Sequence, residues 1–192
     1  SFFQPCARRA DGTGWLLHRN IVIACPAPLC SMLPFRARKN MTATTKPSAD
    51  YENRVRASFA RQKVMAAIGA ELTLVTPGII EIEMPYSAEL TQQHGFLHAG
   101  VISTALDSAC GYAALSLMPD NTGVLTIEFK VNLLSPGRGE RFLFRGTVTK
   151  PGRTIIVADG QAYAYGAEGE AQLIATMTGT MMAVSGREGI ED

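Results

Sequence analysis

The sequence predicts an α+β chain in which one long helix packs against an antiparallel sheet of about six strands. The first observation is an almost uncharged stretch over residues 99–118, where apolar and small residues occur on every side, as in a buried helix. The second is a series of four alternating segments after it, separated by turn clusters. The third is a pair of shorter alternating segments before it. With one long helix for so many strands, we expect the sheet to wrap around the helix.

A shorter helix and a hairpin are predicted before the long helix. Residues 48–68 have Ser48 as a candidate N-cap, an apolar side that includes Val55 and Phe59, and Gly69 as a terminator. We expect this helix to be a packing element. Residues 70–75 and 78–85 alternate on either side of a Thr-Pro-Gly turn, which indicates a hairpin, and residues 86–98 form a polar loop.

Four strands are predicted after the long helix. They cover residues 122–134, 140–150, 154–165 and 171–184, with turns that contain Gly between them. In the first of them, Leu, Ile, Phe and Val alternate with polar residues. We expect the folded domain to cover residues 46–186 and a polar tail to cover residues 187–192.

The composition excludes several classes of protein. Hydrophobic residues make up 46% of the 192 residues, which is enough for a globular core. From residue 41 onward the chain has 12 basic and 16 acidic residues, a balance that does not favour nucleic-acid binding. No run of about 18 apolar residues occurs, so we expect no membrane span. The four cysteines form no CxxC pair and no zinc-type spacing, which predicts a reducing, cytoplasmic setting without disulfides or a bound metal.

Residues 1–45 differ from the rest of the chain. The first 40 residues contain six basic residues, one acidic residue and little periodicity, and Met41 could serve as a native start. We expect this extension to be disordered, or to be upstream sequence translated in frame. A transit peptide is the alternative, since the stretch is rich in Arg and poor in acidic residues.

Asp107 is the residue of the long helix that most needs an explanation. It is the only charged residue between Gln92 and Met118. A carboxylate in an apolar helix costs several kcal/mol unless it has a partner or contacts water. Asp107 is therefore either a catalytic group, acting as general base or nucleophile, or a structural carboxylate that binds a neighbouring group.

A loop motif leads into the long helix, and Asp107 follows the second histidine of that loop by nine residues. The motif reads Gln92-x-x-Gly95-x-x-His98-Ala99-Gly100. Together with residues 123–136 and 152–154, it resembles the hotdog-fold acyl-CoA thioesterases of the phenylacetate-pathway (PaaI-like) family, over about residues 55–184. The usual motif of that family is Asn-x-x-Gly-x-x-His-Gly-Gly. Here Gln92 keeps the amide, and Ala99 keeps the backbone N–H.

The resemblance implies a hotdog fold, hydrolysis of acyl-CoA thioesters, and a homodimer or a homotetramer built as a dimer of dimers. It implies no cofactor beyond the CoA of the substrate. The N–H groups of Ala99 and Gly100 at the helix start would bind the thioester oxygen. These groups lie roughly 11 Å from Asp107 along one helix. The resemblance therefore implies that the loop of one subunit faces the acid of another.

Three further residues are candidates for the catalytic site, each with a simpler explanation. Gln92 would orient the water or the thioester, or it is a solvated loop residue. His98 would position the thioester, or it has a structural role in the loop. Thr126 would place a hydroxyl near Asp107, or it is a strand residue of ordinary β-propensity. Ala99 and Gly100 could likewise do no more than allow a tight turn.

The resemblance also predicts where the substrate binds. Basic side chains at strand ends would bind the CoA phosphates, although solvated surface charge explains each of them equally well. The predicted CoA and substrate contacts are Gly95, Leu97, Ser135, Pro136, Arg138, Lys150, Gly152 and Arg153. The predicted acyl pocket is apolar, which favours an aromatic or medium-chain acyl group. Its predicted lining is Leu90, Phe96, Leu97, Ala105, Cys110 and Tyr112.

Two other functions fit the same fold. One is a non-catalytic acyl-CoA-binding or regulatory module, for which a lone acid on the helix has no use. The other is an enoyl-thioester hydratase, which relies on a His paired with an acid. Here the helix carries Asp107 and no His. Both observations favour the thioesterase.

Overall fold

The computed structural model describes residues 14–18, 21–25 and 48–190, and the chain divides into two units, Ser1–Thr42 and Ala43–Asp192. In the first unit, β1 (Gly14–His18) and β2 (Ile21–Cys25) pair as an antiparallel hairpin, which the sequence analysis did not predict. The expected extension over residues 1–45 otherwise lies outside the described residues. Among the described residues, no helix is both long enough and apolar enough to cross a membrane.

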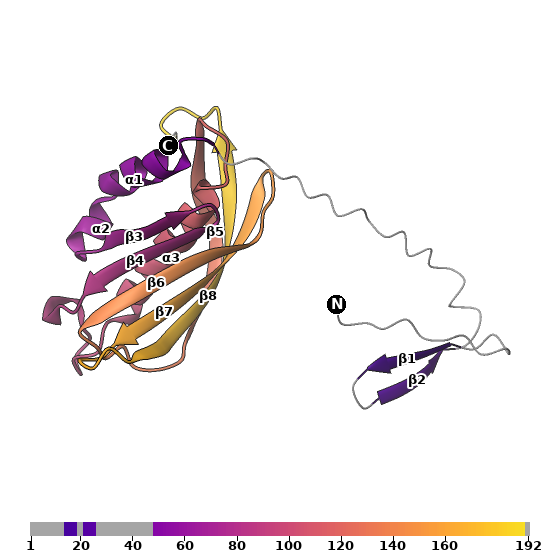
Figure 1. Ribbon diagram of the computed structural model, residues 1–192, viewed down its shortest axis with the longest axis horizontal. Coiled ribbons are helices and arrows are strands. Elements are labelled where there is room, and N and C mark those ends of the chain that lie inside the picture. The colour runs from indigo at the N-terminus through magenta and orange to yellow at the C-terminus, as the bar shows by residue number, and fades with distance from the viewer. Residues whose placement is uncertain (1–13, 19–20, 26–47, 191–192) are drawn as a thin grey trace. The chain divides into compact units, whose positions relative to one another are not determined.

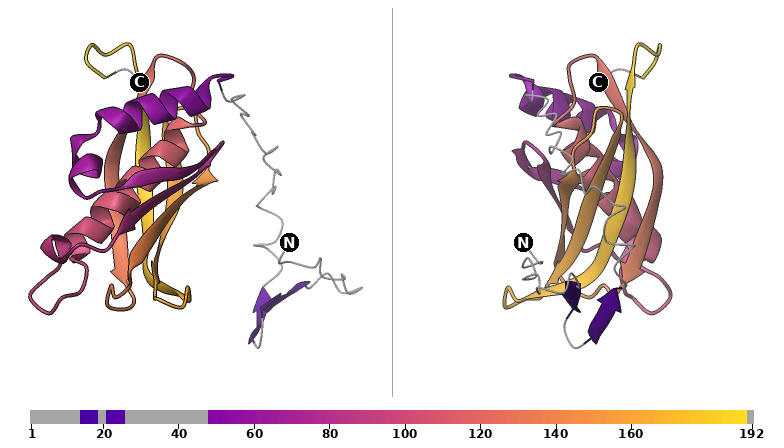
Figure 2. Two further views of the ribbon diagram at one scale, coloured as in Figure 1. Left: turned by 60° about the vertical axis from the view of Figure 1, so that its left-hand side comes forward. Right: turned by 90° about the vertical axis from the view of Figure 1, so that its right-hand side faces the viewer.

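The second unit contains a six-stranded antiparallel sheet and one long helix (Figure 1). The sheet order is β3-β4-β6-β7-β8-β5. Its strands are β3 (Glu71–Thr76), β4 (Ile79–Pro85), β5 (Thr122–Leu133), β6 (Arg141–Lys150), β7 (Ile155–Tyr165) and β8 (Ala171–Ser185). The long helix, α3 (Ala99–Leu115), lies along one face of the sheet and contacts five of these strands (Figure 2). The predicted fold class is confirmed.

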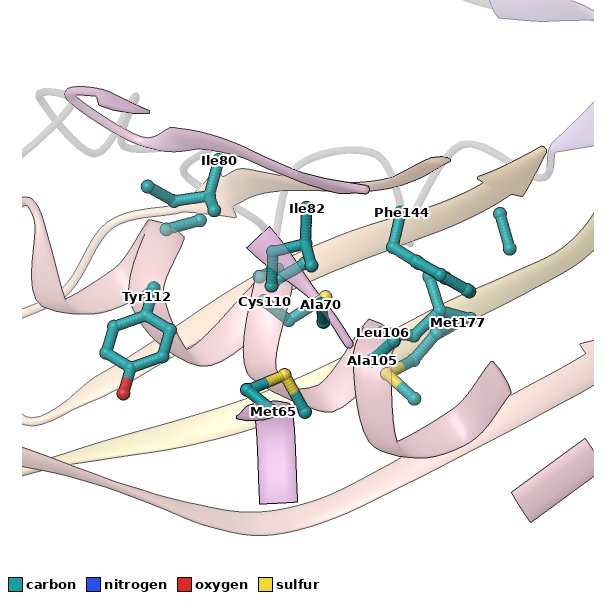
Figure 3. Packing of buried hydrophobic residues seen from close by; sticks show 14 of the residues in the cluster. Met65, Ala70, Ile80, Ile82, Ala105, Leu106, Cys110, Tyr112, Phe144 and Met177 are labelled. Carbon is teal, nitrogen blue, oxygen red and sulfur yellow. The ribbon is translucent and has the colours of Figure 1, made fainter. Parts of the chain in front are cut away.

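Small residues let α3 lie very close to the sheet. A Cβ at Gly146 on β6 would stand 2.3 Å from the Ala109 carbonyl oxygen, so only glycine fits there. Ala109 and Cys110 are fully buried at this contact. Figure 3 shows Ile82 and Phe144 of the sheet pointing toward the helix. The core therefore fixes the position of α3, and with it the position of Asp107.

The predicted helix over residues 48–68 is divided in two, which corrects the sequence analysis. α1 (Tyr51–Arg61) ends before Gln62, whose backbone is extended at φ −80° and ψ 94°, and α2 (Lys63–Ala67) begins after it. Ser48 is not the N-cap. Asp50 holds that position, and the Ser48 Oγ accepts the Asp50 N–H at 3.2 Å. A short 3-10 helix, η1 (Ala88–Leu90), lies within the predicted loop.

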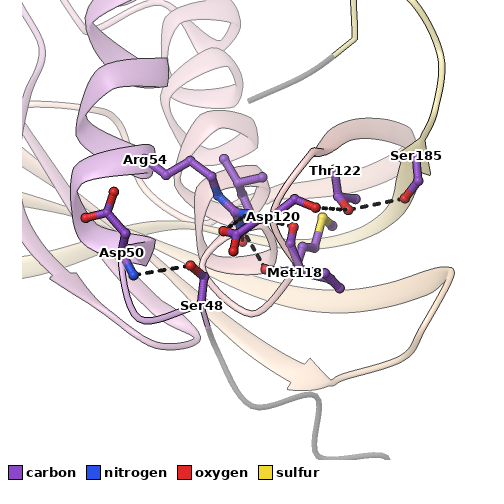
Figure 4. A network of polar contacts seen from close by, with 9 residues as sticks. Ser48, Asp50, Arg54, Met118, Asp120, Thr122 and Ser185 are labelled. Carbon is purple, nitrogen blue, oxygen red and sulfur yellow. Dashed lines mark hydrogen bonds and ion pairs between the residues drawn. The ribbon is translucent and has the colours of Figure 1, made fainter.

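The C-terminus of α3 is capped by a side chain from α1. The Arg54 guanidinium donates to the Leu115 carbonyl at 2.6 Å and to the Met118 carbonyl at 2.8 Å (Figure 4). It also lies 3.4 Å from the Asp120 carboxylate. These contacts satisfy carbonyls that a helix end leaves without intrahelical partners. α3 ends at Leu115, three residues before the predicted end at residue 118, and these contacts hold α1 beside that end.

Candidate functional site

Asp107 lies half-buried on α3 and faces the edge strand β5. Its Oδ1 accepts a hydrogen bond from the Thr126 hydroxyl at 2.8 Å. Burial raises the pKa of Asp107, and the hydrogen bond from Thr126 partly opposes that rise. Within residues 48–190, Asp107 takes part in no ion pair. In the part of the chain that the structure describes, the one hydrogen bond to this carboxylate comes from a neutral hydroxyl, and no cation neutralises its charge.

The Asp107 side chain lines a cleft of about 470 Å³ between α1, α3 and β5. One wall comes from the end of α1 and the residue that follows it, the floor from α3, and the other wall from the start of β5. The lining residues are Ser58, Arg61, Gln62, Asp107, Ser108, Gly111, Tyr112, Val124, Leu125 and Thr126. The first wall was missed by the sequence analysis, which treated residues 48–68 only as a packing element.

Of the residues predicted to line an acyl pocket, only Tyr112 lines this cleft in the described part of the chain. Ala105 and Cys110 are fully buried in the core, and Leu97 is 3% exposed, so none of these side chains lines the cleft. The pKa of Cys110 is raised to about 12 by burial and by the nearby charges of Asp107 and Asp159, which keeps the thiol protonated. The observed cleft is more polar than the predicted one, because hydroxyl and amide groups form one side.

The start of α3 offers one free N–H group and not the predicted two. His98 is the N-cap, and its Nδ1 accepts the Gly100 N–H at 2.9 Å. A Cβ at Gly100 would stand 3.0 Å from that nitrogen, which explains the small residue there. The Ala99 N–H has no hydrogen-bond acceptor among residues 48–190. Since Nδ1 accepts this hydrogen bond, the neutral tautomer of the His98 ring that fits it carries its N–H on Nε2, which is a second donor at this point.

Gln92 stabilises the motif loop and does not line the cleft. Its side-chain oxygen accepts the His94 N–H, and its backbone N–H donates to the Phe96 carbonyl at 2.9 Å. Gly95 completes the turn with a φ of 79°, a left-handed conformation that favours glycine. In one protomer, the motif loop and Asp107 are therefore separate features, about two helical turns apart.

The predicted phosphate-binding residues fall into two groups at opposite ends of β6. Arg138 lies before β6 and stacks over the Phe96 ring at 5.2 Å, while the adjacent Gly137 carbonyl accepts the Leu97 N–H at 2.9 Å. Lys150 ends the same strand. A ten-residue strand spans about 30 Å, so one protomer does not bring these basic residues together.

The remaining predicted contacts have structural roles in turns. Arg153 lies in the β6–β7 turn beyond Lys150. A Cβ at Gly152 would stand 2.1 Å from the Ile155 carbonyl oxygen, so the turn itself requires glycine. The Ser135 N–H donates to the Ile174 carbonyl at 3.2 Å, and the Pro136 carbonyl accepts the Arg138 N–H at 2.9 Å. Ser135 and Pro136 thus hold the loop that lies against the motif loop.

Comparison with known proteins identifies the family. A sequence model of the thioesterase superfamily matches residues 94–169, which include Asp107 and Thr126. The solved structure of a thioesterase family protein from Silicibacter pomeroyi is 60% identical, with a TM-score of 0.70, and the match covers 71% of this chain and 99% of that one. A protein of Saccharolobus solfataricus, named provisionally as an esterase, is 31% identical over 120 residues, which is 62% of this chain and 77% of that protein.

A more distant solved structure shares the fold. The PaaI protein of E. coli, from the phenylacetic acid degradation operon, is 17% identical with a TM-score of 0.63, and the match covers 71% of this chain and 95% of that one. It agrees with the six-stranded sheet and the helix packed on it. The chain belongs to the thioesterase superfamily of hotdog-fold proteins.

Proposed function

We propose that this protein hydrolyses acyl-CoA thioesters, with aromatic or medium-chain acyl groups, to the free acid and CoA. One observation carries the proposal. The Asp107 carboxylate opens into a cleft, forms no ion pair with the described residues, and is held only by Thr126. Burial raises the pKa of this carboxyl group, and a carboxylate with a raised pKa is a stronger base than an ordinary one.

Asp107 supplies the base or the nucleophile. As general base, its carboxylate takes a proton from a water molecule that attacks the thioester carbonyl, and the CoA thiolate leaves. As nucleophile, it attacks the carbonyl directly and forms a mixed anhydride that water then hydrolyses. In both routes the Thr126 hydroxyl holds the carboxylate in place. The hydratase alternative needs a His beside the acid, and the described residues that line the cleft include no His.

The second half of the site would come from another copy of the chain. The Ala99 N–H and the His98 Nε2–H would stabilise the negative charge that develops on the thioester oxygen. They lie about two turns from Asp107 on the same helix, too far to act on the same carbonyl. A partner protomer would present its own helix start to Asp107.

The edge strand β5 supports such a pairing. It pairs with β8 on one side only, because it is the last strand of the sheet. Large apolar side chains on β5 and just beyond it are between 38% and 54% exposed: Leu125, Ile127, Phe129, Leu133 and Leu134. An exposed edge strand with such side chains is a surface for pairing with another chain. An isologous homodimer through β5 would cover it, and two such dimers could form a tetramer.

The CoA contacts also fit a site shared between protomers. Arg138 lies beside the motif loop, whereas Lys150 and Arg153 lie near the opposite end of β6. All three could bind the phosphates of one CoA only if different protomers supplied them. We expect Arg138 to make the contact next to the thioester loop.

The test is thiol release from a panel of acyl-CoAs by the wild type and by Asp107→Asn. We expect the variant to lose about 10²- to 10⁴-fold in kcat, the usual contribution of a positioned general base. Asp159→Asn is a matched control, since Asp159 also accepts hydrogen bonds from threonine hydroxyls but does not line the cleft. Near-full turnover by Asp107→Asn would overturn the mechanism. Acyl-CoA binding without thiol release would favour the non-catalytic module.

A further inference from the structure

The break between α1 and α2 has no cause in the local sequence. Arg61, Gln62 and Lys63 are all good helix formers, and neither proline nor glycine occurs there. Nevertheless the Gln62 backbone is extended, with its N–H donating to the Phe59 carbonyl at 3.0 Å. The Met65 N–H then donates to the Gln62 carbonyl at 3.1 Å as α2 begins. The break therefore depends on contacts with other parts of the fold, among them the burial of Met65 on α2.

One of these contacts is a side-chain hydrogen bond between Gln62 and the residue next to Asp107. The Gln62 Oε1 accepts the Ser108 hydroxyl at 3.1 Å, across 46 positions of sequence. Ser108 is buried, so its hydroxyl depends on this partner. The Gln62 side-chain oxygen is used in this bond, so the two N–H groups of its amide are left as donors. No residue among 48–190 accepts a hydrogen bond from that amide nitrogen, although Gln62 lines the cleft.

The cleft around Gln62 has two different sides. On the α1 side lie Ser58 and Tyr112, whose hydroxyls are 3.5 Å apart. On the β5 side, Val124 and Leu125 are apolar. The floor is open, because a Cβ at Gly111 would have no heavy atom within 4 Å. A ligand with a hydrocarbon surface would pack against the β5 side, and an oxygen on its opposite surface would form hydrogen bonds with the α1 side.

We propose that Gln62 is a specificity-determining residue, whose amide donates to an oxygen substituent, hydroxyl or carbonyl, on the acyl group of the substrate. This inference rests on the proposed thioesterase activity. It also revises the apolar acyl group expected from the sequence. The helix break is then the device that fixes this amide beside the base, with Ser108 holding it in one orientation.

The experiment uses pairs of acyl-CoAs that differ by one oxygen. The pairs are phenylacetyl-CoA with its ring-hydroxylated isomers, and octanoyl-CoA with its hydroxylated and oxo forms. We expect the wild type to give a kcat/KM about tenfold higher for at least one oxygenated member than for its partner, as one recovered hydrogen bond allows. Gln62→Met, of similar volume but without a donor, should bring that ratio close to one. It also removes the acceptor of the Ser108 hydroxyl, so the result is taken from the ratio and not from the rate on either member.

Two variants control the interpretation. Gln161→Met changes an exposed glutamine on β7 and should leave the ratio unchanged. Gln62→Asn keeps the amide but shortens its reach, so it should lower the ratio even if Gln62→Met fails to fold. Equal hydrolysis of every pair by the wild type would overturn this inference and leave the thioesterase proposal standing, as would an equal loss on both members in Gln62→Met. The absence of thiol release from all substrates would overturn both proposals.

Discussion

Gly111 lies in the interior of the buried helix α3. Replacing it with alanine should raise the stability of the fold and lower the turnover of bulky substrates. The backbone at Gly111 is helical, and an added Cβ would have no heavy atom within 4 Å. Alanine in a helix interior is favoured over glycine by about 0.8–1 kcal/mol. Gly111→Ala should therefore increase the free energy of unfolding by about 1 kcal/mol, which raises the Tm of a chain of this size by about 2–4 °C.

The same methyl group should impair turnover of bulky substrates, because it enters the cleft beside Asp107. A methyl group that meets a bound acyl group costs about 1–3 kcal/mol, which corresponds to about a 5- to 150-fold loss in kcat/KM. The measurements are thermal unfolding and thiol release with acyl groups of increasing size. The loss should grow with acyl size and be absent for the smallest acyl group.

Gly146→Ala is the contrasting variant. Its Cβ would stand 2.3 Å from the Ala109 carbonyl oxygen, a backbone atom that moves only if α3 moves. This substitution should destabilise the fold by about 1–3 kcal/mol or more. If Gly111→Ala lowered the Tm, or raised it while the turnover of large acyl-CoAs was unchanged, the assignment of the cleft to the acyl group would be wrong.

Three further predictions follow from the site. Burial raises the pKa of Asp107, so protonation of this group stabilises the fold at low pH. That contribution to the free energy of unfolding is lost as the pH rises from the ordinary pKa of 3.8 through the raised pKa. Urea unfolding at a series of pH values should show this dependence in the wild type and not in Asp107→Asn. The hydrogen bond from Thr126 lowers the pKa of Asp107, so Thr126→Val should move the acid limb of the pH–rate profile to higher pH, whereas an unmoved limb would mean that Asp107 is not the titrating base. With a pKa of about 12, the Cys110 thiol should resist iodoacetamide in the folded protein and react only after unfolding, which mass spectrometry would follow.

Local patterns in the sequence predicted most of the fold. The alternation of apolar and polar residues gave the strand β6 to within one residue, since it starts at Arg141 and not at residue 140. The start of α3 at Ala99 was also predicted, because the polar loop gives way to apolar residues there. These features depend on residues that are neighbours in the sequence, so the pattern alone contains them.

The parts that were missed depend on contacts between distant residues. At the helix break, Gln62 contacts Ser108, which lies 46 positions away and which no local signal links to it. The hydrogen bond from the Gly100 N–H to His98, which removes that N–H from the predicted oxyanion site, is a local contact. It could have been predicted, because a His two residues before a helix glycine is a possible N-cap. The separation of Arg138 from Lys150 could also have been predicted, because successive turns of an antiparallel sheet lie at opposite ends of each strand.

The most direct test of the whole account is whether two inactive variants restore each other. Ala99→Pro removes the free N–H at the first helical position, where proline is well tolerated, and Asp107→Asn removes the base. Each variant alone should be nearly inactive, whereas Ala99→Gly, which keeps the N–H, should remain active. Co-refolding the two inactive variants should restore about a quarter of the wild-type thiol release, because half of the dimers would be mixed and each would hold one intact site. A mixture that stayed as inactive as its components, with mixed dimers confirmed by mass, would contradict a site shared between two copies of the chain.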